Sequence, residues 1–175
     1  MDISNDQALK QLKDLLGLEK PPKRIEGYDI SHQSGENVVG SMVVFTNGAS
    51  DRAEYRKFKL HHQKNDDTKN LREIIGRRLK HENWTYPDLV ILDGGEGQIN
   101  AVKDLLDAAK IPVIGRNKSG DHSRNTAVNI VIPEKGILEI NPHSHLAKLV
   151  ARIDEEAHRF AITYHRLLKR KNMLK

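Results

Sequence analysis

Two aspartates stand where apolar strands are expected to end. Asp93 directly follows the apolar run 89–92 and precedes Gly94 and Gly95, and Asp29 lies near the end of a predicted strand that begins at Arg24. Open α/β sheets place their chemistry just beyond the carboxyl ends of their strands. Two carboxylates a few ångströms apart repel each other, and a bound divalent cation relieves that repulsion. If the two strands are parallel neighbours, the sequence predicts a cation site between Asp29 and Asp93.

The order of the predicted elements makes that adjacency possible. An antiparallel meander of three strands comes first, followed by a helix and then by a strand, a helix and a short strand that together read as a βαβ unit. The predicted ranges are 24–30, 37–46 and about 53–60 for the meander, about 68–82 for the helix, and 88–92, 98–110 and 111–115 for the βαβ unit. The first strand is then free to pair with the strand that ends before Asp93.

The two ends of the chain carry further predicted elements. Residues 127–132 and 137–140 are expected to form a hairpin, and a long final helix follows it. Apolar residues recur along that helix at i, i+3, i+4 and i+7 spacing: Leu146, Leu149, Val150, Ile153, Ala157, Phe160, Ala161 and Tyr164. At the other end, a helix over 6–18 is followed by a proline pair. We therefore predict an N-terminal helix and linker over 1–22 and one globular domain over 23–175.

Composition limits the function classes. The chain of 175 residues has no cysteine, which excludes disulfides, thiolate catalysis and cysteine zinc sites, and leaves carboxylates and histidines as metal ligands. The formal charge of +5 makes a polyanion a plausible partner. No apolar run is long enough to span a bilayer and the start carries no signal-peptide pattern, so neither a membrane partner nor export is predicted and a cytoplasmic location is the default.

Three motifs in order resemble a known family. They are Asp29-Ile30-Ser31-His32, Asp93-Gly94-Gly95-Glu96-Gly97-Gln98 and Asp154-Glu155-Glu156-Ala157-His158-Arg159-Phe160-Ala161. Together they resemble the C-terminal endonuclease domain of UvrC, the incision subunit of bacterial nucleotide excision repair, over about residues 23–169. The resemblance implies an α/β, ribonuclease H-like fold, with a mixed sheet of about five strands flanked by helices and an extra hairpin before the final helix.

The same resemblance implies an activity and a site. The activity is metal-dependent cutting of damaged double-stranded DNA on the 5′ side of a lesion, with Mg²⁺ or Mn²⁺ as cofactor and a UvrB-type helicase as partner. Asp29, Asp93 and His158 are then the catalytic and metal-binding residues. The role of His158, as ligand or in proton transfer, stays open. Asp67 matches a possible additional acid, although capping of the following helix explains it fully.

A DNA-binding surface is predicted beside these residues. Arg152, Arg159 and Arg166 repeat every seven residues and share one helix face with Arg170, and His165 lies further along the same helix. Such a stripe is suited to a DNA backbone, and its alternative is a solvated helix face. Gly94, Gly95 and Gln98 are expected to let a DNA strand pass close to Asp93.

Other sites are disfavoured by the spacing of their residues. His61-His62 and His143-Ser144-His145 lack partner ligands at usual zinc spacing. The run 95–100 lacks the third glycine of a dinucleotide fingerprint and there is no Walker A motif, so no nucleotide cofactor is predicted. Two departures from the family pattern border the site, the run 115–118 and Glu96. A catalytically silent DNA-binding or scaffold module of the same fold is the alternative function.

Overall fold

A single mixed sheet with helices on both faces organises the described residues. The computed structural model describes residues 2–32, 38–60, 66–117 and 128–173. The elements, in chain order, are α1 (Ile3–Leu16), β1 (Arg24–His32), β2 (Val38–Thr46), β3 (Ala49–Ser50), the 3₁₀ turn η1 (Arg52–Glu54), β4 (Arg56–Leu60), α2 (Asp67–Leu79), β5 (Leu89–Asp93), α3 (Glu96–Ala108), β6 (Val113–Asn117), β7 (Val128–Ile132), β8 (Gly136–Ile140) and α4 (His145–Met173). These bounds agree with the predicted elements to within a few residues.

The strand order confirms the predicted adjacency of the two aspartate-bearing strands. The sheet runs β3-β2-β1-β5-β6-β7-β8, with β4 paired to β2. Strand β1 is antiparallel to β2 and parallel to β5, and β5 is in turn parallel to β6. The crossover helix α3 joins β5 to β6 as in a βαβ unit.

The predicted extra hairpin belongs to the sheet. Strand β7 pairs antiparallel with β6 through the pairs Gly115↔Val131 to Asn117↔Asn129, and β8 then pairs with β7. With the two-residue strand β3 included, the described residues form eight strands where about five and a separate hairpin were expected. The reason is that β6 runs two residues beyond its predicted end, and its backbone groups there are satisfied by β7.

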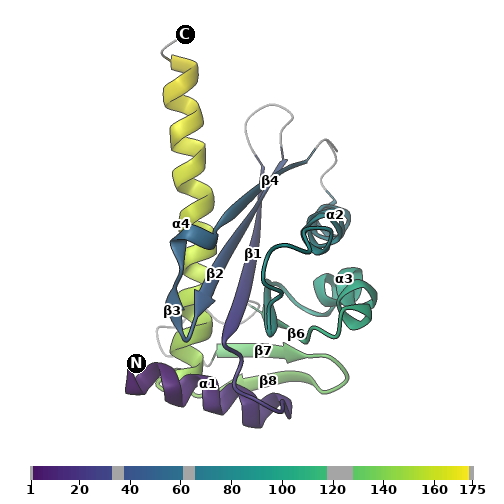
Figure 1. The fold of residues 1–175 in the computed structure, drawn as a ribbon, viewed down its shortest axis with the longest axis vertical. Helices are drawn as coiled ribbons and strands as arrows, with labels where there is room; N and C mark the ends of the chain where they lie inside the picture. The colour runs from purple at the N-terminus through teal and green to yellow at the C-terminus, as the bar shows by residue number, and fades with distance from the viewer. Residues whose placement is uncertain (1, 33–37, 61–65, 118–127, 174–175) are drawn as a thin grey trace.

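Each face of the sheet carries its own apolar core. Helices α2 and α3 cover one face, where Ile74 and Val102 are fully buried against Met42. Helix α4 covers the other, where Ile153 is fully buried against Val43 (Figure 1). Helix α4 approaches β1 so closely that a Cβ added to Gly27 would lie 2.6 Å from Cγ2 of Ile153. The absence of a side chain at Gly27 therefore allows α4 to pack this close to the sheet.

The N-terminal helix packs on the α4 side. Leu9 and Leu12 of α1 are buried in the same core as Ile153, and the side-chain oxygen of Gln11 accepts a hydrogen bond of 3.0 Å from the Leu146 backbone N–H at the start of α4. Figure 1 shows α1 lying across the end of the sheet at which β1 begins. The division of the chain at residue 22 stays a prediction.

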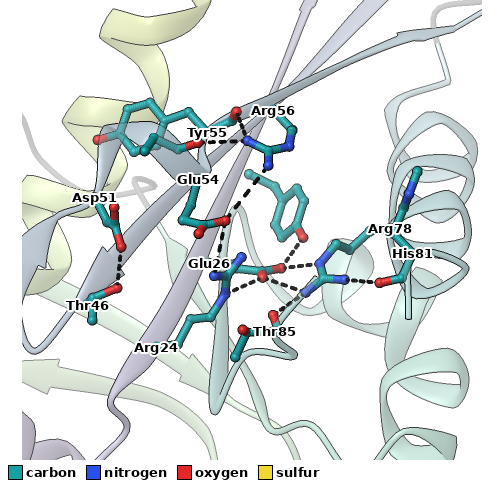
Figure 2. Close-up of polar contacts among 12 residues, drawn as sticks. Arg24, Glu26, Thr46, Asp51, Glu54, Tyr55, Arg56, Arg78, His81 and Thr85 are labelled. Carbon is teal, nitrogen blue, oxygen red and sulfur yellow. Dashed lines mark hydrogen bonds and ion pairs between the residues drawn. The ribbon is translucent and has the colours of Figure 1, made fainter. Parts of the chain in front are cut away.

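A buried ion network fixes α2 to the start of β1. Glu26 is 0% exposed and its carboxylate accepts hydrogen bonds of 2.9 Å from Nε and Nη2 of Arg78 on α2, whose side chain is 1% exposed. Arg24 and the Tyr28 hydroxyl also donate to Glu26, at 3.0 and 2.6 Å. Figure 2 shows Glu26 held between Arg24 and Arg78, with Arg78 also reaching the carbonyl of Thr85 at 2.6 Å.

Candidate active site

Asp29 and Asp93 lie side by side near the carboxyl ends of their strands. Tyr28 of β1 is paired with Leu92 of β5, so the next residue on each parallel strand, Asp29 and Asp93, belongs to one cross-strand row. Both line a pocket of about 80 Å³, and the Asp29 side chain is 14% exposed. The pocket is lined by Tyr28, Asp29, Ile30, Asp67, Leu71, Leu92, Asp93 and Gln98. The sequence-predicted pair is therefore brought together.

Helix α4 places His158 above this row. Because Tyr28 faces the core under α2 and α3, Asp29 as its neighbour on the strand points to the α4 side. Nδ1 of His158 lies 4.0 Å from Oδ2 of Asp29, and the His158 side chain is 64% exposed. The ring thus stands next to one carboxylate and remains open to a substrate.

Two cations flank the carboxylate pair in the same row. On one side, Asp29 is paired with Ser41 of β2 and Ser41 with Lys57 of β4. On the other, Asp93 is paired with Arg116 of β6, whose Nη1 donates a 2.8 Å hydrogen bond to Asp154 on α4. Sequence reasoning placed the run 115–118, which contains Arg116, at the border of the site but missed Lys57, because Lys57 enters the row only through the register of strands β2 and β4.

Lys57 is unusual among the lysines of the sheet because it is partly buried under α4. Its Nζ donates to the Ser41 hydroxyl at 3.2 Å and to the backbone carbonyl of Phe160 at 2.9 Å. Burial lowers the pKa of Lys57 to about 8, and the nearby negative charge of Asp29 acts in the opposite direction. A cation is therefore held beside Asp29 against the desolvation that opposes its charge.

Asp67 lines the same pocket, and its capping interpretation is wrong. The N-cap of α2 is Asp66, whose Oδ1 accepts from the Lys69 backbone N–H at 3.2 Å and from the Thr68 hydroxyl at 2.7 Å. Asp67 is the first residue of the helix, and its Oδ1 lies 2.8 Å from Nε2 of His32 at the end of β1. The assignment of Asp67 as an additional acid stays a prediction.

The glycine turn after Asp93 is shaped by its own neighbours. Gly94 has a φ of 135°, and the Gly95 backbone N–H donates to Oε1 of Gln98 at 3.1 Å. A Cβ added to Gly115 on β6 would lie 2.4 Å from the carbonyl oxygen of Gly94. The turn is therefore pressed against β6, and Gln98 has a structural role at the start of α3. DNA contact by Gly94, Gly95 and Gln98 stays a prediction.

The predicted arginine stripe of α4 divides into two parts. Arg152 donates to Oδ1 of Asn5 on α1 at 2.9 Å, and Arg159 donates to both oxygens of Glu156 at 2.7 and 2.6 Å. Arg166 and Arg170 are exposed on the outer part of the helix. The side chain of His165 lies outside the described residues. All four arginines are exposed, but the inner two are engaged by Asn5 and Glu156.

The donor set suits a hard cation with few protein ligands. Within the described ranges, no three His, Cys, Asp or Glu side chains are grouped so that they could hold an ion by themselves. Mg²⁺ is commonly bound by one or two carboxylates, with water and substrate phosphate completing its shell. Asp29 and Asp93, which line one pocket, fit that requirement. Of the disfavoured zinc histidines, His61 and His62 lie outside the described residues.

The geometry of the fold defines a class of protein. A mixed sheet with carboxylates on neighbouring parallel strands and a C-terminal helix across one face is that of a ribonuclease H-like nuclease domain. The structure is similar in fold to Ciona intestinalis endonuclease V in complex with an inosine-containing 24mer DNA. The TM-score is 0.53 at 12% identity, over 93% of this chain and 97% of that one.

The chain belongs to the family of the UvrC RNase H endonuclease domain, whose family model matches residues 13–162. It is 44% identical over 171 residues to UvrABC system protein C of Clostridioides difficile strain 630, covering 96% of the chain and 27% of the relative. For the Clostridium perfringens strain 13 protein of the same name, the values are 40% over 191 residues, 97% and 30%. The chain thus spans less than a third of the length of these relatives.

Of the helices in the described part of the chain, none combines the length and the apolar character that crossing a membrane requires.

Proposed function

We propose that the chain hydrolyses a DNA phosphodiester with the help of a divalent cation and makes the 5′ incision beside a lesion in nucleotide excision repair. The observation that supports this most directly is the placement of Asp29 and Asp93 in one row and one pocket, with His158 above Asp29. The family to which the chain belongs supports the endonuclease class.

Each residue of the site has a part in that reaction. Asp29 and Asp93 would hold Mg²⁺ or Mn²⁺, which supplies charge neutralisation for the phosphate and acidifies the attacking water. His158 is exposed, so its ring can reach a substrate oxygen, and we assign it to proton transfer. Arg116 is held by Asp154, which fixes α4, and therefore His158, over the carboxylates.

The rest of the molecule would position the DNA. The exposed Arg166 and Arg170 extend from the site along α4 and are suited to phosphate contacts. Aromatic residues make up only 5% of the chain, which gives little capacity for stacking on bases. Damaged double-stranded DNA is therefore expected to be delivered by a UvrB-type partner, with no nucleotide cofactor in this domain, in the cytoplasm.

The test is incision of a lesion-bearing duplex by the C. difficile relative in which this chain replaces the matching segment. Asp29→Asn and Asp93→Asn should each lower the 5′ incision rate by at least about 100-fold, because each removes charge from the cation site. His158→Ala should lower the rate by about 100-fold while leaving Mn²⁺ binding to the isolated chain unchanged. The control is Asp88→Asn, which changes the residue directly before β5.

Two outcomes would contradict the proposal. Normal incision by the Asp29→Asn and Asp93→Asn variants would show that these carboxylates do not take part in the reaction. Calorimetry of the isolated chain that finds no Mn²⁺ binding dependent on Asp29 would favour the alternative, a catalytically silent DNA-binding module of the same fold.

A further inference from the structure

We propose that Lys57 is a positioning residue of the incision site, which holds α4 over Asp29 and opposes the cation that Asp29 binds. The inference rests on the proposed function and adds to it a residue of β4 that none of the three family-like motifs contains. If the inference holds, a variant without the Lys57 charge binds the divalent cation more tightly but cuts DNA more slowly.

The contacts of Lys57 join three elements at the site. The side chain starts on β4, its Nζ donates to the Ser41 hydroxyl on β2, and it also donates to the carbonyl of Phe160 on α4. Ser41 is the direct neighbour of Asp29 in the cross-strand row. A single ammonium therefore connects the strand next to Asp29 with the helix that carries His158.

The α4 contact falls close to His158. Phe160 is two residues after His158, and the Lys57 ammonium lies 3.7 Å from the centre of the Phe160 ring. The same ring packs edge to face on Tyr55, at 5.0 Å between centroids. On the opposite side of the row, Arg116 holds Asp154, one turn before His158. The turn of α4 that carries His158 is thus fixed by a cation on each side.

Stability alone does not account for a lysine at this position. Burial under α4 disfavours the ammonium, and its two hydrogen bonds and its position over the Phe160 ring offset only part of that cost, since the pKa of Lys57 stays lowered. Methionine would fill the same space with no charge to desolvate. A cation kept in a place that disfavours charge is typical of a functional site. At this position the Lys57 ammonium lies in the same cross-strand row as Asp29.

The electrostatic consequence has a definite sign. A positive charge beside Asp29 reduces the attraction of that carboxylate for a divalent cation. Its removal should therefore tighten binding of the cation to the site. A purely structural lysine would give the opposite result, because a loosened α4 and β2 would leave Asp29 less well oriented and weaken binding.

The experiment compares Lys57→Met, Lys57→Arg and the control Lys59→Met, which removes the same charge from an exposed residue of the same strand. Mn²⁺ binding to the isolated chain is measured by calorimetry. For Lys57→Met, the dissociation constant should fall roughly threefold to tenfold. Lys57→Arg keeps the charge and should bind Mn²⁺ as the unchanged chain does, as should Lys59→Met.

Incision is measured in the chimaeric relative described above. Lys57→Met should slow it by about 10-fold to 100-fold at saturating Mn²⁺, because a small displacement of His158 is enough to lose that much rate. Lys57→Arg should recover part of the rate. Urea denaturation should show that Lys57→Met is at least as stable as the unchanged chain, so that the slower cutting is not due to unfolding.

Weaker or unchanged Mn²⁺ binding by Lys57→Met, or incision at the normal rate, would overturn the inference. The Asp29→Asn variant separates this failure from that of the proposed function. If Asp29→Asn is inactive and Lys57→Met is normal, only the role of Lys57 fails. If Asp29→Asn also cuts normally, the proposed incision site fails with it.

Discussion

At the scale of single residues, one row of the sheet carries two neighbouring carboxylates with a cation on each side. The row crosses strands β4, β2, β1, β5 and β6. Lys57 and Arg116 lie at its two ends, and Asp29 and Asp93 lie next to each other between them. The outer cations partly balance the carboxylates when no other cation is bound, which limits the repulsion between them. The same cations hold α4 through Phe160 and Asp154. Charge balance and helix placement are therefore properties of the same side chains.

Glu156, two residues before His158 on α4, makes contacts whose contribution to stability depends on pH. Its carboxylate accepts from Arg159 and from the Tyr55 hydroxyl, the latter at 2.9 Å. The hydrogen bond from Arg159 lowers the pKa of Glu156 below its usual 4.5, burial opposes this, and Tyr55 adds to the lowering. Because the folded pKa is depressed, the contribution to stability is complete above about pH 4.5 and is lost as the pH falls through the folded value.

We therefore expect Glu156→Gln to lower the free energy of unfolding by about 1 kcal/mol at neutral pH. The difference from the unchanged chain should shrink as the pH is lowered below about 4.5, because both chains then carry a neutral group at this position. Urea denaturation at several pH values measures it. Glu155→Gln, on the exposed side of the same turn, is the control. A difference that stays constant down to acid pH would show that charge is not its cause.

At the scale of elements, α2 is tied to β1 by buried charge. Arg78 and Glu26 are almost completely buried, and Arg78 also donates to the Thr85 carbonyl (Figure 2). The network lies at the start of β1, whereas Asp29 lies towards its end. It thus fixes the strand and the helix from which Asp29 and Asp67 project, and it reaches the pocket itself only through Tyr28.

Removing one partner of this network should be strongly destabilising. Arg78→Met leaves Glu26 buried with only part of its hydrogen bonding, and we expect a loss of about 3 to 5 kcal/mol in the free energy of unfolding. Glu26→Met added to Arg78→Met should recover part of the loss, because the buried carboxylate is then gone and Arg24 keeps an ion pair with Glu54 at 3.7 Å. Arg77→Met, at an adjacent residue whose side chain is 41% exposed, should change stability far less. Equal losses for Arg77→Met and Arg78→Met in urea denaturation would show that burial of the ion pair is not the determinant.

The sequence predicts the elements better than their pairing. The apolar runs and turns place β1, β2, β5 and α3 nearly where they lie. The antiparallel meander leaves β1 free to pair with β5, so the Asp29–Asp93 pair is accessible to sequence reasoning. The continuation of the sheet into the hairpin is not, because it depends on backbone pairing beyond Gly115. The role of Lys57 depends on contacts with residues up to 103 positions away.

At the scale of the whole molecule, α4 changes its role along its length. Its first half covers the sheet and carries Asp154 and His158, and its second half continues beyond the sheet (Figure 1). From Ile162 onward the described side chains of α4 are exposed: Ile162, Thr163, Arg166, Leu167, Arg170, Lys171 and Met173. The candidate site thus lies at the base of an exposed helical segment with basic side chains, and under the proposed function this segment would lead DNA to the carboxylates.

This arrangement predicts which arginines set the salt dependence of DNA binding. Arg166→Gln with Arg170→Gln should weaken binding of the chain to a lesion-free duplex and reduce the slope of log affinity against log salt by about 2, since each exposed arginine neutralises one phosphate. Arg152→Gln with Arg159→Gln should reduce the slope less, because those side chains are engaged by Asn5 and Glu156.

Fluorescence anisotropy between about 50 and about 200 mM salt measures the slopes. Lys10→Gln with Lys13→Gln on α1 is the matched control, because it removes the same charge from the end of the sheet where β1 begins, whereas Asp29 lies towards the other end of that strand. The outer arginine pair should change the slope and the α1 pair should leave it nearly unchanged. If both pairs reduced it equally, DNA would be held by the overall positive charge of the chain, and the outer half of α4 would have no special place in leading DNA to Asp29 and Asp93.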